Sequence, residues 1–139
     1  MTELHLADTS AWNRSGRNQE VAERWETLLV DGSIAICPPV RLELLYSARS
    51  PADYAALSDD LSGLLELPLD DRAVARAEEV QALLAETSQH RAARAVDLYI
   101  AAVAELNEAI LLHYDRHFEA ISAATGQAAE WIAPRASLD

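Results

Sequence analysis

The chain has 139 residues, with 11 basic and 23 acidic side chains and a net charge of -12. This length fits one domain and excludes a second domain with its own core. No apolar stretch approaches the roughly 20 residues that cross a bilayer, and the single cysteine, Cys37, excludes disulfide-stapled and thiolate-zinc classes. Every basic residue is Arg, which also excludes Lys-dependent phosphate loops, Schiff bases and phosphoacceptor receiver domains.

The N-terminal residues and the charge also indicate location and partners. Glu3 stands where a secretory signal would carry a basic residue, and no apolar signal core follows it. We therefore expect a cytoplasmic protein with no membrane association. So acidic a chain repels nucleic acid unless metal ions or local Arg clusters offset the charge.

Hydrophobic periodicity predicts alternating strands and helices along the first half of the chain. A short apolar run ends at Asp8, Thr9 and Ser10, which favour a turn or a helix start. The elements expected in this half are a strand at 4–7 ending in a turn, an amphipathic helix at 19–30, a strand at 33–37, and helices at 40–48 and 51–65.

The second half continues the same alternation. Its composition is rich in Ala and Leu, which favours helix, and Gly126 is placed to end a helix. The elements expected here are an extended piece at 66–69, helices at 70–87, 96–105 and 115–125, strands at 109–114 and 130–132, and a loose tail.

Strands separated by helices imply βαβ units. The sequence therefore predicts a single α/β domain, residues 1–139, with a central, mostly parallel β-sheet and helices on both faces. In such folds, binding sites form beyond the carboxyl ends of the strands. The side chains expected at that edge are the ones that bear on function.

Four acidic residues lie in or directly after apolar runs, unlike most of the others. Asp8 and Asp115 each follow a predicted strand, while Glu43 and Asp97 lie within helices between apolar neighbours. An unpaired buried carboxylate is costly or becomes neutral. We expect the four to converge at the carboxyl edge of the sheet, where shared cations would compensate them.

Carboxylate oxygens without clustered Cys or His suit Mg²⁺, with Mn²⁺ as a substitute. Such ions bind a scissile phosphate, activate water and stabilise the leaving oxygen without a protein nucleophile. The four acids therefore favour a metal-dependent nuclease.

Simpler roles for the same residues stay open. Asp8 and Asp115 are good helix N-caps, the commoner use of an Asp after a strand. Glu43 and Asp97 have Arg41, Arg91 and Arg94 as alternative partners. The residues that could support the carboxylates of a nuclease site are Thr9, Ser10, Arg91, Arg94 and His117.

The same residues carry a resemblance to PIN-domain ribonucleases, specifically to VapC-like toxins of type II toxin-antitoxin systems. Four segments carry it, in order and across essentially the whole chain: LADTSAW at 6–12, PPVRLELLYSAR at 38–49, AVDLYIAA at 95–102 and LHYDRHF at 112–118.

The resemblance implies a Mg²⁺-dependent endoribonuclease whose acidic quartet is Asp8, Glu43, Asp97 and Asp115. It also implies a homodimer, a heterotetramer or larger assembly with a cognate antitoxin, and inhibition by a C-terminal antitoxin segment that lies across the active-site groove. The net charge of -12 predicts independently that this partner is basic. Many relatives carry a second Asp after the strand-end Asp, where this chain has His117. His117 cannot supply that charge, so the sequence is compatible with a site for one ion or for two.

Two other functions compete with the nuclease. A phosphatase or phosphoacceptor also keeps an Asp after its first strand, but this chain has neither a second acid beside Asp8 nor the required Lys. A catalytically weak or inactive binding module with the same fold would be expected to have lost some of the four acids, and all four are present. RNA cleavage in the presence of Mg²⁺ separates these alternatives.

Overall fold

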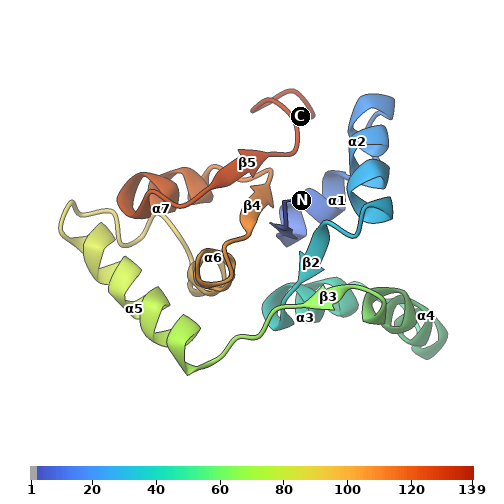
Figure 1. The fold of residues 1–139 in the computed structure, drawn as a ribbon, viewed down its shortest axis with the longest axis horizontal. Helices are drawn as coiled ribbons and strands as arrows, with labels where there is room; N and C mark the ends of the chain where they lie inside the picture. The colour runs from blue at the N-terminus through green and yellow to red at the C-terminus, as the bar shows by residue number, and fades with distance from the viewer. Residues whose placement is uncertain (1–2) are drawn as a thin grey trace.

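A computed structural model of the chain describes residues 3–139. Its sheet has five strands in the order β3-β2-β1-β4-β5, and every neighbouring pair is parallel. Figure 1 shows the sheet at the centre of the molecule. The strands are β1 (His5–Ala7), β2 (Ile34–Ile36), β3 (Leu65–Glu66), β4 (Ile110–His113) and β5 (Ala129–Trp131). The predicted α/β class and parallel sheet are confirmed.

Seven helices connect the strands within the part of the chain that the structure describes. They are α1 (Thr9–Arg14), α2 (Gln19–Val30), α3 (Pro38–Tyr46), α4 (Pro51–Ser62), α5 (Asp71–Ala85), α6 (Ala95–Leu106) and α7 (His117–Thr125). Six of them match predicted helices within a few residues. The exception is α1, where the sequence pattern predicted only a turn; the Asp8 side chain caps this helix.

The two faces of the sheet have separate cores because successive residues of a strand point to opposite faces. Leu6 and Leu111 belong to the core under α3 to α7, while Ala7 and Leu112 belong to the core under α1 and α2. In Figure 1, α5 and α7 accordingly lie on one side of the sheet, with α1 and α2 on the other. Helices on both faces are thus confirmed.

The C-terminal tail is packed, although the sequence predicts a loose tail. Leu138 is 6% exposed and belongs to the core under α1 and α2. Its N–H donates to the Tyr114 hydroxyl at 2.8 Å, and its carbonyl accepts from Arg17 at 3.1 Å. One apolar residue near the end of a polar segment therefore fixes the tail against the domain.

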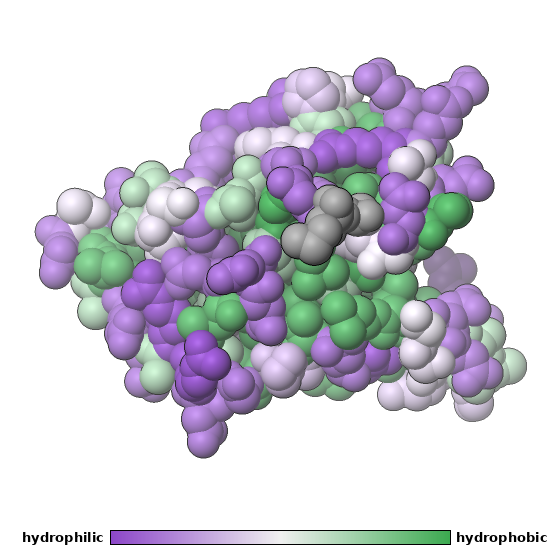
Figure 2. All heavy atoms as spheres, in the orientation of Figure 1, coloured by the Kyte–Doolittle hydropathy of each residue, from purple (hydrophilic) through white to green (hydrophobic). Residues whose placement is uncertain are grey.

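The surface is mostly polar around a central apolar area on the face that Figure 2 shows. Within residues 3–139 no helix is long and apolar enough to cross a membrane. The first two residues of the N-terminal segment lie outside the described residues.

Candidate functional site

The strand order places the candidate site at the point where the chain reverses direction across the sheet. From β1 the chain runs outward to β2 and β3, then returns to the other side of β1 to form β4 and β5. The carboxyl ends of β1 and β4 therefore flank a topological switch point, where ligands bind in open α/β folds. Asp8 directly follows β1, and Asp115 comes two residues after β4 ends.

Asp8 is 4% exposed and is held at the start of α1. Its Oδ1 accepts hydrogen bonds from the Ser10 hydroxyl at 2.6 Å and from the Ala11 N–H at 3.1 Å. The Ser10 hydroxyl also accepts from the Tyr114 N–H at 2.8 Å. Asp8 is thus an N-cap that is also placed at the edge of the sheet, and Ser10 joins it to the segment that carries Asp115.

Asp97 and Asp115 lie on either side of His117. The His117 Nδ1 is 3.4 Å from Asp97 Oδ2 and 3.4 Å from Asp115 Oδ1. Asp97 is 3% exposed and accepts from the Arg94 N–H at 3.1 Å, at the start of α6. Asp115 accepts from the His117 N–H at 3.0 Å. The predicted residues Asp97, Asp115 and His117 therefore lie together.

Glu43 reaches the site through Thr9. The Thr9 hydroxyl donates to Glu43 Oε1 at 2.8 Å, so α3 and the start of α1 are joined beside Asp8. Glu43 is only partly buried, and its neighbour Leu42 is 67% exposed, so the apolar flanks do not draw Glu43 fully into the core as the sequence suggested.

The three arginines expected as alternative partners of the acids have three different surroundings. Arg94 approaches Asp97, with its Nε 3.5 Å from Oδ2, while Arg41 pairs with Glu66 at 3.3 Å instead of Glu43. Arg91 is exposed and has no ion pair among residues 3–139. The structure therefore brings Thr9, Ser10, Arg94 and His117 to the acidic residues, and gives Arg91 no contact there.

Burial raises the pKa of Asp8 from 3.8 to about 7. Hydrogen bonds from Ser10 and Ala11 oppose this rise in pKa, and the negative charge of Asp115 adds to it as a lesser cause. Desolvation therefore outweighs like-charge repulsion from Asp115 in raising the pKa of Asp8.

His113 is a site residue that the sequence analysis missed. Its Nδ1 accepts the Asp115 N–H at 3.2 Å, and its ring lies against Phe118 and Trp131 with centroid distances of 5.2 and 4.9 Å. Burial lowers the pKa of His113 from 6.5 to about 4, so the ring is neutral and able to accept near pH 7. Its place at the end of an apolar strand, two residues before Asp115, was the available signal.

Two tryptophans and the single cysteine have structural roles. Trp12 and Trp25 pack edge to face, with ring centroids 4.7 Å apart. Cys37 is buried, which raises the pKa of its thiol to about 12 and leaves it unsuited to act as a thiolate nucleophile.

The donor set at the site suits a hard divalent cation. The hydrogen bonds and ion pairs of Asp8, Glu43, Asp97 and Asp115 within residues 3–139 use one oxygen of each carboxylate, which leaves the other oxygen for a ligand. Carboxylate oxygens are the donors that Mg²⁺ and Mn²⁺ prefer. However, no three His, Cys, Asp or Glu side chains of the described residues already stand close enough to hold an ion together, so a shared ion stays a prediction.

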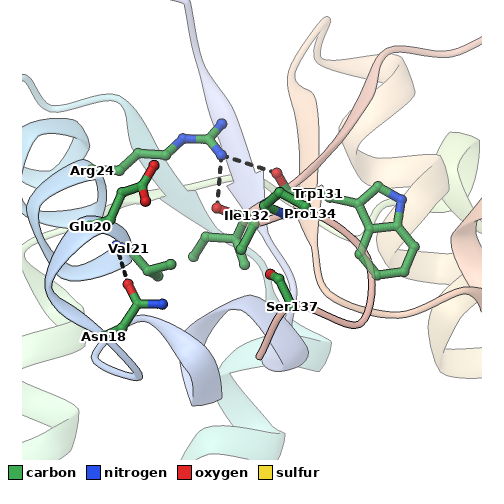
Figure 3. Close-up of a pocket in the computed structure, with 9 residues that line it drawn as sticks. Asn18, Glu20, Val21, Arg24, Trp131, Ile132, Pro134 and Ser137 are labelled. Carbon is green, nitrogen blue, oxygen red and sulfur yellow. Dashed lines mark hydrogen bonds between the residues drawn. The ribbon is translucent and has the colours of Figure 1, made fainter. Parts of the chain in front are cut away.

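Two hollows lie near this end of the molecule. One, of about 480 Å³, is lined by Ser10 and Asp115. The other, of about 540 Å³, lies between α2 and the segment after β5. Figure 3 shows that Arg24 crosses this second hollow to the carbonyls of Trp131 and Ile132, each 3.0 Å away. Because the Arg24 guanidinium also pairs with Glu130 at 2.7 Å, its charge is already used within the fold.

A parallel α/β sheet with Asp8 and Asp115 after the strands at its switch point defines the class of this protein as an α/β domain with acidic residues at the sheet edge. Residues 6–124 match the sequence model of the PIN domain. The chain therefore belongs to the PIN-domain family.

Named relatives span nearly the whole chain. Ribonuclease VapC18 of Mycobacterium tuberculosis is 47% identical over 137 residues, covering 97% of this chain and 99% of the relative. Ribonuclease VapC21 of the same species is 38% identical over 133 residues, covering 95% and 96%.

Solved structures share the fold at lower identity. DNA-bound VapBC from Salmonella typhimurium has a TM-score of 0.74 and 21% identity, over 96% of this chain and all of that one. VapBC2 from Rickettsia felis, bound to a promoter DNA fragment, has a TM-score of 0.74 and 19% identity, over 92% and 98%. These neighbours support the fold assignment.

Proposed function

We propose that the chain is a Mg²⁺-dependent endoribonuclease toxin whose metal ligands are Asp8, Glu43, Asp97 and Asp115. The observation that carries the proposal is His117, whose Nδ1 lies 3.4 Å from both Asp97 and Asp115 at the switch point of a PIN-domain sheet. Relatives up to 47% identical over almost the full chain are named as ribonucleases, which supports RNA as the substrate.

The four carboxylates would hold the cation, and Mn²⁺ would be a substitute for Mg²⁺. When bound, the cation supplies positive charge to the scissile phosphate and activates a water molecule. Asp8 and Asp97, held by backbone N–H groups at two helix starts, keep their oxygens in fixed positions. Hydrolysis adds water across the phosphodiester bond, so no covalent bond to the protein forms.

Residues around the carboxylates orient them. The Thr9 hydroxyl donates to Glu43, and the Ser10 hydroxyl donates to Asp8. His113 accepts the Asp115 N–H and so fixes the backbone that carries this carboxylate. His117 contributes no negative charge where many relatives have a second Asp, which favours weaker binding of a second ion.

The proposed partner is a cognate antitoxin with a basic segment. A solved structure that this fold resembles, with a TM-score of 0.64 and 23% identity, belongs to the VapBC family of toxin-antitoxin systems. With a net charge of -12 and a site expected to hold four carboxylates, the chain favours a partner whose Arg side chains pair with the carboxylates and exclude Mg²⁺. The toxin would act as a homodimer, within a heterotetramer or larger complex, in the cytoplasm.

The test is RNA cleavage by purified protein. We expect Asp97→Asn to lower Mg²⁺-dependent cleavage at least about 100-fold because one charged ligand is lost, while the amide oxygen still accepts the Arg94 N–H and the helical circular dichroism persists. Asp70→Asn is the matched control: Asp70 is an exposed N-cap of α5 that accepts from the Ala73 N–H. Near-normal cleavage by Asp97→Asn would contradict the proposal.

A negative result has a defined alternative. If the wild-type protein cleaves no RNA in a cellular pool with Mg²⁺ or Mn²⁺ but binds its neighbouring gene product, the chain is an inactive PIN-fold binding module.

A further inference from the structure

The hollow beside Asp115 gathers arginines in a strongly acidic protein. Three of the 11 arginines line it, namely Arg14, Arg116 and Arg135, against two acidic residues, Asp115 and Asp139. The rings of Tyr114 and Trp131 line the same hollow. Arginine and aromatic rings together are the side chains that bind single-stranded nucleic acid.

The charges of these arginines are largely available to a ligand. Within residues 3–139, Arg14 and Arg116 have no carboxylate partner, and Arg116 is exposed. The Arg14 Nε is buried without a hydrogen-bond partner among those residues, its Nη1 donates to the Ser10 carbonyl at 3.4 Å, and its guanidinium lies 4.8 Å from the Tyr114 ring centroid. Arg135 pairs with Glu119 at 3.1 Å in an exposed contact, which a stronger anion can replace.

The hollow adjoins the proposed active site because they share two residues. Ser10 and Asp115 line the hollow, and the same Ser10 hydroxyl donates to Asp8. An RNA strand that presents its scissile phosphate to the four carboxylates would therefore place a neighbouring nucleotide here.

We propose that Arg14, Arg116 and Arg135 bind a phosphate of the RNA next to the scissile one, with the adjoining base against Trp131. The proposal rests on the proposed function and adds to it the residues that overcome the repulsion between an acidic protein and its substrate. Of the two hollows described above, only this one has guanidinium groups without a carboxylate partner among residues 3–139, because Arg24 in the other is held by two carbonyls and Glu130.

RNA fits the hollow better than an acidic protein segment does. The Trp131 ring is partly exposed and packs edge to face against the buried Tyr114, at 87° with centroids 5.4 Å apart, so Trp131 presents aromatic surface against which a base can stack. A volume of about 480 Å³ exceeds what a carboxylate needs and leaves room for a base and its phosphate.

The test measures RNA binding rather than cleavage. Fluorescence anisotropy in EDTA with two short single-stranded oligoribonucleotides of unrelated sequence, checked on a gel for intactness, compares wild type with Arg116→Gln and with Arg116→Gln/Arg135→Gln. Arg72→Gln is the matched control, since Arg72 is exposed at the start of α5 and outside the hollow.

We expect about 3- to 10-fold weaker binding for Arg116→Gln and a larger loss for the double variant, equal for both sequences because phosphates carry no sequence information. The slope of log affinity against log salt should become shallower by about 0.7 for each phosphate that the variant no longer neutralises. An oligomer of the same length without bases should bind wild type more weakly.

Unchanged affinity and salt slope in the double variant would overturn the proposal, as would an equal loss in Arg72→Gln. If the double variant binds RNA normally but loses its antitoxin, the hollow docks protein and the proposal is wrong. Equal binding of the base-free oligomer would overturn the placement of the base. Failure of the proposed function is distinguishable: the chain would then leave RNA intact with Mg²⁺, whatever the arginine variants do to binding in EDTA.

Discussion

The four candidate metal ligands form two pairs that the fold treats differently. Asp8 and Asp97 are 4% and 3% exposed, and each accepts a backbone N–H at the start of a helix. Glu43 and Asp115 are only partly buried and lie beside Thr9 and His117. The hydrogen bonds at each helix start use one carboxylate oxygen, so they leave the other oxygen for the proposed metal ion. The buried pair is fixed by folding, and the other pair has more freedom to adjust.

The largest effect is expected on stability, when Asp8, one of the two buried carboxylates, is replaced. Because the folded-state pKa of Asp8 is about 7 against an ordinary 3.8, its contribution to stability is fully present below about pH 4 and is lost as pH rises through 7. Asp8→Asn removes this loss. In EDTA, the free energy of unfolding of Asp8→Asn minus that of wild type should increase by about 1.4 kcal/mol per pH unit between pH 4 and 7.

Urea unfolding at several pH values measures this difference. Asp70→Asn, an exposed N-cap variant, should differ from wild type by a constant amount across the same range. A constant difference for Asp8→Asn as well would show that Asp8 is not a buried, desolvated acid.

The next largest effect is expected at His113, which accepts the Asp115 N–H and so supports one of the two partly buried carboxylates. His113→Phe keeps an aromatic ring against Phe118 and Trp131 but removes the acceptor of the Asp115 N–H, so we expect about a 10-fold loss of cleavage and about 1–2 kcal/mol of stability. His113→Asn, whose Oδ1 can take the place of Nδ1, should recover most of the cleavage. Equal activity of the two variants would show that this hydrogen bond does not position Asp115.

Most of the fold could be predicted from the sequence, because long periodic helices and apolar strand runs carry strong local signals. The helix α1 could not, since it has six residues and only Ala11 is buried. Asp8 and Asp115 were placed at the sheet edge by the strands before them. Glu43 and Glu66 have similar flanks in sequence, and only tertiary contacts separate them: Glu43 meets Thr9, and Glu66 meets Arg41.

The role of His113 also depends on tertiary structure. Its hydrogen bond to the Asp115 N–H and its two ring contacts form only when the turn after β4 packs against β5 and α7. In the same way, one side chain near the C-terminus, Leu138, decides whether the tail packs.

A smaller effect is expected for His117, which lies between Asp97 of the buried pair and Asp115 of the partly buried pair. His117→Asp adds a carboxylate close to Asp97 and Asp115, where His117 now lies 3.4 Å from each. We expect the Mg²⁺ concentration for half-maximal cleavage to fall severalfold, since ligand charge raises cation affinity, and the metal-free protein to become less stable through like-charge repulsion. His117→Asn is the uncharged control. A similar fall in the Mg²⁺ requirement for His117→Asn would contradict the role of charge.

The smallest effect is expected at Arg94, where the backbone and the side chain both approach Asp97. The guanidinium is 3.5 Å from Oδ2, but the Arg94 side chain is 68% exposed, and exposed ion pairs contribute about 0–1 kcal/mol. The Arg94 N–H, which every residue except Pro retains, is 3.1 Å from the same oxygen. Arg94→Gln should therefore change the free energy of unfolding by less than about 0.5 kcal/mol and cleavage by less than about threefold.

Arg76→Gln provides the contrast, because Arg76 is 26% exposed and contacts both Glu105 and Glu79. Its loss should therefore cost more stability in the same urea titration. A larger loss for Arg94→Gln than for Arg76→Gln would mean that the guanidinium, and not the helix start, holds Asp97 in place.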